Sequence, residues 1–163
     1  AVVNDASGQG GNTLIEIYDA TDPGATGSDL INLSTRGSVG LGGYLVGGFV
    51  VSGNTPKRVL IRGVGPGLES FGVVYALSEA SLVLTLRVDG EDVAVGENTG
   101  WASQPNVDGI VEATGNAGAF ALDPVNQDSA MLLWLEPGVY TATIQPGSPG
   151  LSGTALIEVY QVD

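Results

Sequence analysis

The sequence breaks into short runs of Val, Ile, Leu and Thr that are separated by glycine and proline. The 163 residues include 26 glycines and 8 prolines, and no long stretch has helical periodicity. Many short strands bounded by turn residues are typical of antiparallel sandwiches and barrels. We therefore expect an all-β antiparallel sandwich of jelly-roll type. The expected strands are Thr13–Tyr18, Leu30–Ser34, Tyr44–Val51, Arg58–Gly63, Ser81–Val88, Val93–Gly96, Ala130–Leu135, Gly138–Gln145 and Ala155–Val162.

Two sharp turns lie between these strands. Asp89–Gly90 separates one pair of strands and Glu136–Gly138 separates another, so both predict antiparallel hairpins. Val107–Thr114 has apolar residues at helical spacing, which predicts a short helix over an open end of the sheets. We expect a further helical turn within Leu68–Leu77.

The strongest internal pattern is a repeated strand. Gly11–Tyr18, with the sequence GNTLIEIY, reappears near the C-terminus as Gly153–Tyr160, with the sequence GTALIEVY. Successive residues of a strand point to opposite faces, so each copy has one β-branched face and one face of Leu, Glu and Tyr. The two copies therefore suit the same kind of position in a sheet. The residues concerned are Leu14, Ile15, Glu16, Ile17 and Tyr18 in the first copy and Leu156, Ile157, Glu158, Val159 and Tyr160 in the closing copy.

A chain with two copies of its closing strand has either two equivalent positions for that strand or one strand that is available to pair with another molecule. The stretch Ala20–Asp29 is rich in Asp, Pro, Gly, Ser and Thr, and it spans about 30–36 Å when extended. Strand addition between molecules is a known mode of recognition, and a head-to-tail version generates fibres. We interpret Leu14–Tyr18 as a donor strand for a neighbouring subunit. Two other interpretations stay open: the first copy ends a preceding tandem repeat, or it is an edge strand of its own molecule.

Charge and missing residue types exclude several classes of function. Eighteen acidic and five basic residues give a net charge of -13, so nucleic acids and anionic membranes would repel the chain. No run of about 18 apolar residues exists to insert into a bilayer. Histidine and cysteine are absent, which removes the usual nucleophile pairs and the common transition-metal ligands. We expect no enzymatic activity, and no nucleic-acid or membrane-inserted partner.

Carboxylates are the remaining candidates for chemistry. Two groups lie close in sequence: Asp89, Glu91, Asp92 and Glu97, and Asp19, Asp22 and Asp29. Neither group has the spacing of an EF-hand, so we interpret them as solvated acids, with calcium as the one cofactor that stays open. Paired carboxylates can also hydrolyse glycosides, but no pair is singled out here.

Four other features have a structural and a functional interpretation. Gly63–Gly67 superficially resembles a phosphate loop, but no Lys-Ser/Thr follows and Pro66 lacks an amide N–H, so a structural turn is predicted. Trp134 lies in an apolar run and is predicted to be core, whereas Trp101 lies in a polar loop and is the candidate contact for a ligand such as a glycan. The basic residues are expected to pair with acids across strands or between subunits. They are Arg36, Lys57, Arg58, Arg62 and Arg87.

Several stretches resemble a repeat domain of large secreted and cell-surface bacterial proteins. They are Leu30–Gly40, Gly48–Val51, Pro56–Pro66, Gly118–Leu122, Leu135–Ala142 and Ala155–Tyr160. The resemblance implies a β-sandwich without catalysis that occurs in tandem and ends in a strand such as Leu156–Tyr160. The N-terminal copy then looks like the inherited end of a previous repeat. At Asn98–Trp101 the chain departs from the more acidic pattern of the family, so we carry no cation site over.

These patterns predict a donor strand and linker over residues 1–28 and a β-sandwich over residues 29–163. We expect a secreted bacterial protein, extracellular or at the cell surface with its signal peptide removed, that polymerises with itself. The alternative is a carbohydrate-binding or adhesive module of a larger tandem-repeat surface protein.

Overall fold

The computed structural model describes residues 1–3, 6, 8, 12–16 and 31–162. The chain divides into two compact units, Ala1–Leu30 and Ile31–Asp163. The described part of the second unit contains eight strands, one α-helix and two 3-10 helices. Their bounds are β1 Asn32–Val39, β2 Leu45–Val51, β3 Lys57–Val64, η1 Pro66–Phe71, β4 Ala80–Val88, β5 Glu91–Thr99, η2 Trp101–Ser103, α1 Val107–Asn116, β6 Ser129–Leu135, β7 Gly138–Pro146 and β8 Gly153–Gln161.

The strands pair in a nested order. β1 pairs with β8, β2 with β7, β3 with β6 and β4 with β5, all antiparallel. Further pairs between β3 and β8 and between β4 and β7 complete two sheets. Sheet A has the order β1-β8-β3-β6 and sheet B the order β2-β7-β4-β5. This is the strand order of a jelly roll, so the expected antiparallel sandwich is confirmed.

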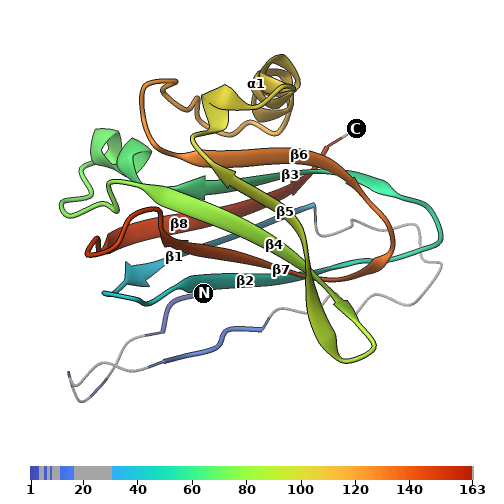
Figure 1. The fold of residues 1–163 in the computed structure, drawn as a ribbon, viewed down its shortest axis with the longest axis horizontal. Helices are drawn as coiled ribbons and strands as arrows, with labels where there is room; N and C mark the ends of the chain where they lie inside the picture. The colour runs from blue at the N-terminus through green and yellow to red at the C-terminus, as the bar shows by residue number, and fades with distance from the viewer. Residues whose placement is uncertain (4–5, 7, 9–11, 17–30, 163) are drawn as a thin grey trace. The chain divides into compact units, whose positions relative to one another are not determined.

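Sheet A is covered on both faces. One face packs on sheet B, and the other packs under α1 and the adjoining loops, above β6 in Figure 1. A strand in this position has no solvent-exposed face, and β3 is accordingly buried at every position from Val59 to Val64. The core between the sheets includes Ile61, Leu82, Leu84, Ile144 and Ile157. The second core, between sheet A and α1, includes Leu60, Val64, Trp101, Ile110 and Tyr160.

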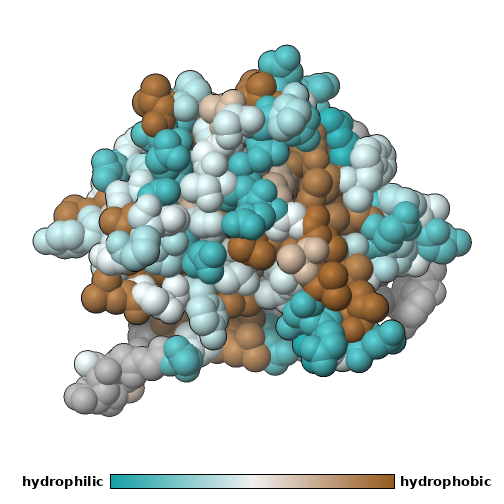
Figure 2. Space-filling view, in the orientation of Figure 1, coloured by the Kyte–Doolittle hydropathy of each residue, from teal (hydrophilic) through white to brown (hydrophobic). Residues whose placement is uncertain are grey.

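Within residues 31–162 no helix or strand covers the outer face of sheet B, so its strands alternate between buried and accessible residues. In β7, Tyr140, Ala142 and Ile144 are buried and the residues between them are not. The outer face still has apolar members, because Val50 and Val139 are exposed. On the face viewed in Figure 2, polar and apolar side chains are interspersed, with a band of apolar side chains to the right of centre.

All eight strands expected from residue 30 onward are present, with shifted ends. The expected helix is α1, and the expected helical turn near Leu68 is η1. α1 contacts β6 and β3, so it covers the outer face of sheet A and not an open end of the sandwich. No helix among the described residues is long and apolar enough to cross a membrane.

One predicted hairpin is confirmed and the other is wrong. Asp89 and Gly90, with φ of 50° and 89°, join β4 to β5 as a tight turn. β6 belongs to sheet A and β7 to sheet B, so the second turn takes the chain from one sheet to the other. The Tyr140 hydroxyl donates a hydrogen bond of 2.9 Å to the Glu136 carbonyl and fixes this crossing. A sharp turn between apolar strands occurs both in hairpins within one sheet and in crossings between two sheets, so the sequence pattern could not distinguish them.

The strand expected over Thr13–Tyr18 is absent from its described part. Thr13–Glu16 have no regular secondary structure, and Ile17 and Tyr18 lie outside the described residues.

Candidate strand-addition site

The closing copy of the repeated sequence forms the centre of sheet A. β8 lies between β1 and β3 and pairs with both. Glu158 lies opposite Ser34 on one side and opposite Arg62 on the other. Because both of its neighbours are in place, this position already has its full set of strand pairs.

The two faces of β8 enter different cores, as the alternation in the sequence predicts. Ile157 and Val159 belong to the core between the sheets. Tyr160 is buried in the second core and Leu156 packs against it. The repeated residues are therefore those of a strand that is covered on both faces.

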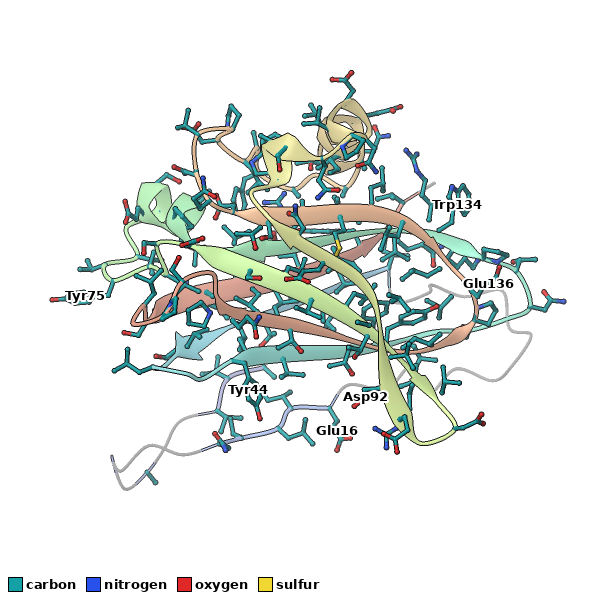
Figure 3. The ribbon with its side chains drawn as sticks, in the orientation of Figure 1. Glu16, Tyr44, Tyr75, Asp92, Trp134 and Glu136 are labelled. Carbon is teal, nitrogen blue, oxygen red and sulfur yellow. The ribbon has the colours of Figure 1, made fainter. Side chains whose placement is uncertain are left out.

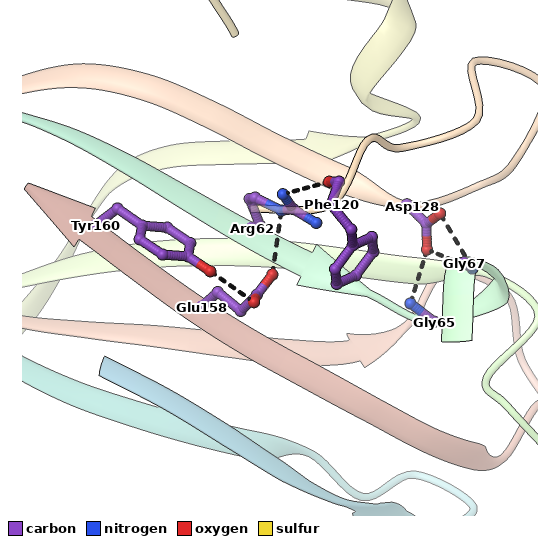
Figure 4. A network of polar contacts seen from close by, with 7 residues as sticks. All are labelled: Arg62, Gly65, Gly67, Phe120, Asp128, Glu158 and Tyr160. Atoms are coloured by element: carbon purple, nitrogen blue, oxygen red, sulfur yellow. Dashed lines mark hydrogen bonds and ion pairs between the residues drawn. The ribbon is translucent and has the colours of Figure 1, made fainter. Parts of the chain in front are cut away.

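A buried ion pair connects β8 to β3 (Figure 4). Arg62 Nε lies 3.2 Å from Glu158 Oε2, and the Arg62 side chain is completely buried. The Tyr160 hydroxyl donates a 2.7 Å hydrogen bond to Glu158 Oε1. Arg62 Nη1 donates a 2.8 Å hydrogen bond to the Phe120 carbonyl, and the guanidinium lies 4.3 Å from the centre of the Phe120 ring. The network thus joins two strands to the loop that covers them.

Burial dominates the electrostatics of this network. It lowers the pKa of Arg62, while the charge of Glu158 acts in the opposite direction. Burial, followed by the hydrogen bond to Glu158, raises the pKa of Tyr160 to about 12. Among the described residues, Arg62 Nε and Nη2 and Glu158 Oε2 have no partner of hydrogen-bonding geometry. The pair is therefore held by charge and packing, and removal of either partner leaves a buried charge.

The glycine-rich loop after β3 binds a carboxylate of its own chain. Asp128 Oδ1 accepts hydrogen bonds from the backbone N–H of Gly65, at 2.8 Å, and of Gly67, at 3.2 Å. Burial raises the pKa of Asp128, and these two hydrogen bonds oppose the shift. A Cβ on Gly65 would lie 2.2 Å from the Leu77 carbonyl oxygen, so only glycine fits there. The loop is a structural turn whose amides are already used.

The first copy of the repeat is only partly described. Leu14 and Ile15 are exposed. Glu16 is exposed and has no regular secondary structure, and Ile17 and Tyr18 lie outside the described residues. The assignment of Leu14–Tyr18 as an interface stays a prediction.

The predicted positions of the two tryptophans are reversed. Trp101 is 5% exposed, belongs to the second core and donates a 3.2 Å hydrogen bond from Nε1 to the Asp123 carbonyl. Trp134 is 70% exposed and projects outward from β6 (Figure 3). The run Ala130–Leu135 of β6 is apolar on both faces, so it gave no sign that Trp134 lies beyond the cover of α1. Trp101 has no exposed ring face for a ligand.

A shallow groove of about 210 Å³ lies beside Trp134. Arg58, Asn106 and Gly109 line it together with the apolar residues Leu132 and Leu133. A second hollow of about 420 Å³ lies where β1 begins and β8 ends. Neither is lined by a carboxylate, so neither offers a pair of acids for hydrolysis.

The charged candidates resolve into pairs and solvated groups. Arg62 pairs with Glu158, and Arg87 pairs with Asp92 at 3.0 Å, each across neighbouring strands, which is one of the two arrangements expected for the basic residues. Within the described ranges, no three His, Cys, Asp or Glu side chains lie close enough to hold a metal ion. Asp19, Asp22 and Asp29 lie outside these ranges.

No protein-family model matches the chain, and no curated protein matches it. Among solved structures, the chain is similar to the pre-peptidase C-terminal domain of a collagenase from Bacillus anthracis. The two are 16% identical with a TM-score of 0.46, and the match covers 79% of this chain and 89% of that one. The fold assignment rests on the strand order given above.

Proposed function

We propose that this chain is an extracellular structural subunit that polymerises head to tail by donating its N-terminal strand to a neighbouring copy. The proposal is supported by the position of β8, which occupies the centre of sheet A with strands on both sides. The sequence contains this strand twice. The sandwich over residues 31–162 uses one copy and has no second position of the same kind.

The side-chain requirements of the repeat support the same proposal. Glu158 is accommodated by Arg62, and of the arginines, all of which the structure describes, only Arg62 is buried. The first copy keeps Glu at position 16, yet the arginine that suits the closing position is already used. The closing-strand position of the same molecule is therefore taken by β8, which is consistent with donation of the first copy to a neighbour. The extracellular location rests on the family resemblance of the sequence.

The test uses the intact chain with the first copy disrupted. Ile15→Lys/Ile17→Lys places two charges on one face of the donor strand, and Val3→Lys adds a charge outside the repeat as the control. We expect the parent and Val3→Lys to form polymers in light scattering and negative-stain microscopy, and the double variant to stay monomeric with an unchanged melting temperature. Polymers of the double variant, or a parent that is monomeric at all concentrations, contradict the proposal.

A glycan-binding module is the second candidate function. Its support is the exposed Trp134 beside the groove that Arg58 and Asn106 line. An exposed aromatic ring with nearby hydrogen-bond donors suits a sugar ring. Binding on a glycan array that Trp134→Ala abolishes is the expected result for this function, and the absence of binding by the parent excludes it for the glycans tested.

A further inference from the structure

The two sheets have four edges, and two of them are protected in the described structure. The edges are β1 and β6 in sheet A and β2 and β5 in sheet B. On β6, the Asn98 side chain accepts from the Ala130 N–H at 2.9 Å, and Asn106 donates to the Leu132 carbonyl at 3.1 Å. These two amides occupy the backbone groups that an added strand would need.

β5 is protected by charge and by shape. It carries Glu91, Asp92 and Glu97, which would repel the acidic N-terminal segment. Its pairing with β4 passes from Leu84–Gly96 to Thr85–Ala94, so one residue of β5 is bulged out of the ladder. Charges and bulges are the usual means by which sheet edges avoid pairing with other chains.

β1 is a polar edge. Its exposed positions are Asn32, Ser34, Arg36 and Ser38. Such a row offers little apolar surface to the face of an added strand.

β2 has none of these protections. Its sequence, LVGGFVV, contains no charged residue and no proline. Within the part of the chain that the structure describes, it pairs only with β7 and no side chain is hydrogen-bonded to its backbone. In an antiparallel strand, half of the backbone N–H and C=O groups point away from the existing partner. This free side of β2, Leu45–Val51, is here called the acceptor edge.

The side chains of β2 are also incompletely covered. Leu45 and Phe49 face the core between the sheets but are only half-buried. Val46 and Val50 face outward and are 45% and 67% exposed. An added strand would cover both the inward row and the outward row of β2 if it had one β-branched face and one face of Leu, Glu and Tyr.

We propose that the acceptor edge receives residues 12–18 of a second copy of this chain; this inference rests on the proposed function. In β8, Ile157 and Val159 face the core between the sheets, and Ile15 and Ile17 are their counterparts in the repeat. With the same orientation, Ile15 and Ile17 cover Leu45 and Phe49. Leu14, Glu16 and Tyr18 then lie on the outer face, beside a row of β2 that has no acidic residue.

The experiment places charges on the acceptor edge of the intact chain. Val46→Lys/Val50→Lys is compared with Val93→Lys/Val95→Lys, which adds the same charges at residues that are 48% and 43% exposed on β5, at the opposite edge of sheet B. We expect the β2 variant to lose polymer formation and the β5 variant to keep it, with both melting temperatures close to that of the parent.

A mixture of variants separates this inference from the proposed function. Ile15→Lys/Ile17→Lys keeps an acceptor edge, and Val46→Lys/Val50→Lys keeps a donor strand. We expect each to be monomeric alone and the mixture to give a one-to-one dimer that grows no further. If only the N-terminal variant loses polymers, the donor strand stands and the acceptor edge is overturned. If only the β2 variant loses them, the edges of two copies pair directly and both proposals are overturned.

Discussion

Arg62 Nε lies 3.2 Å from Glu158 Oε2 in the interior of sheet A, where each residue is the register partner of the other. A buried pair of this kind strongly destabilises the fold when one partner is removed. We expect Glu158→Gln and Arg62→Met each to lower the free energy of unfolding by about 3–5 kcal/mol. The double variant should lose less than the sum, with a coupling above about 1 kcal/mol in urea denaturation. Strictly additive losses would mean that the two charges do not interact.

The Tyr160 phenol gives the protein a pH dependence in the alkaline range. Its pKa in the folded state, about 12, is above the ordinary value of about 10. The stabilisation is therefore present below pH 10 and is lost as the pH rises toward 12. We expect Tyr160→Phe to be less stable at pH 7 and to lose less stability than the parent between pH 10 and 12. Tyr75→Phe, at an exposed position, controls for the loss of one phenol in the same denaturation series.

The reversed tryptophans predict opposite responses to substitution. Trp101→Ala removes a ring from the second core and should cost about 3–5 kcal/mol. Trp134→Ala removes an exposed ring and should change stability by less than about 1 kcal/mol. Acrylamide should quench the fluorescence of Trp101→Phe, which keeps Trp134, far more strongly than that of Trp134→Phe. Equal quenching of the two would contradict the positions described here.

Two glycines predict changes of opposite sign. Gly90 has φ of 89° in the turn between β4 and β5, so Gly90→Ala should destabilise the protein by about 1–2 kcal/mol. Gly115 lies in α1 with open space where a Cβ would be, so Gly115→Ala should stabilise it by about 0.5–1 kcal/mol. Thermal unfolding of both variants provides the measurement.

Local patterns predicted most of the fold. Glycine and proline mark the ends of the strands, and the Asp89–Gly90 turn identifies its hairpin because few residues adopt positive φ. The spacing within Val107–Thr114 identifies α1 for the same local reason. Pairing of Arg62 and Arg87 with acids was predicted, but their partners were not, because these depend on the register between strands.

Non-local features escaped prediction. Strands β6 and β7 look alike in sequence whether they pair or belong to different sheets. The burial of Trp101 and the exposure of Trp134 depend on which part of sheet A is covered by α1. The burial of Arg62 was not predicted, because Glu158 and Phe120, which surround it, come from distant segments of the chain. The repeat of β8 is visible in the sequence itself. The unprotected edge could be identified only from the order of the strands in the two sheets.

The nested pairing has a mechanical consequence. Asn32, at the start of β1, is paired with Tyr160, near the end of β8. A force applied between these two ends loads the β1–β8 hydrogen bonds one at a time, beginning at the Asn32–Tyr160 end, so they break in sequence. A force applied between Ile31 and β2 instead acts on contacts other than the β1–β8 hydrogen bonds, because β1 and β2 belong to different sheets. The force that the domain withstands therefore depends on the two points at which it is pulled.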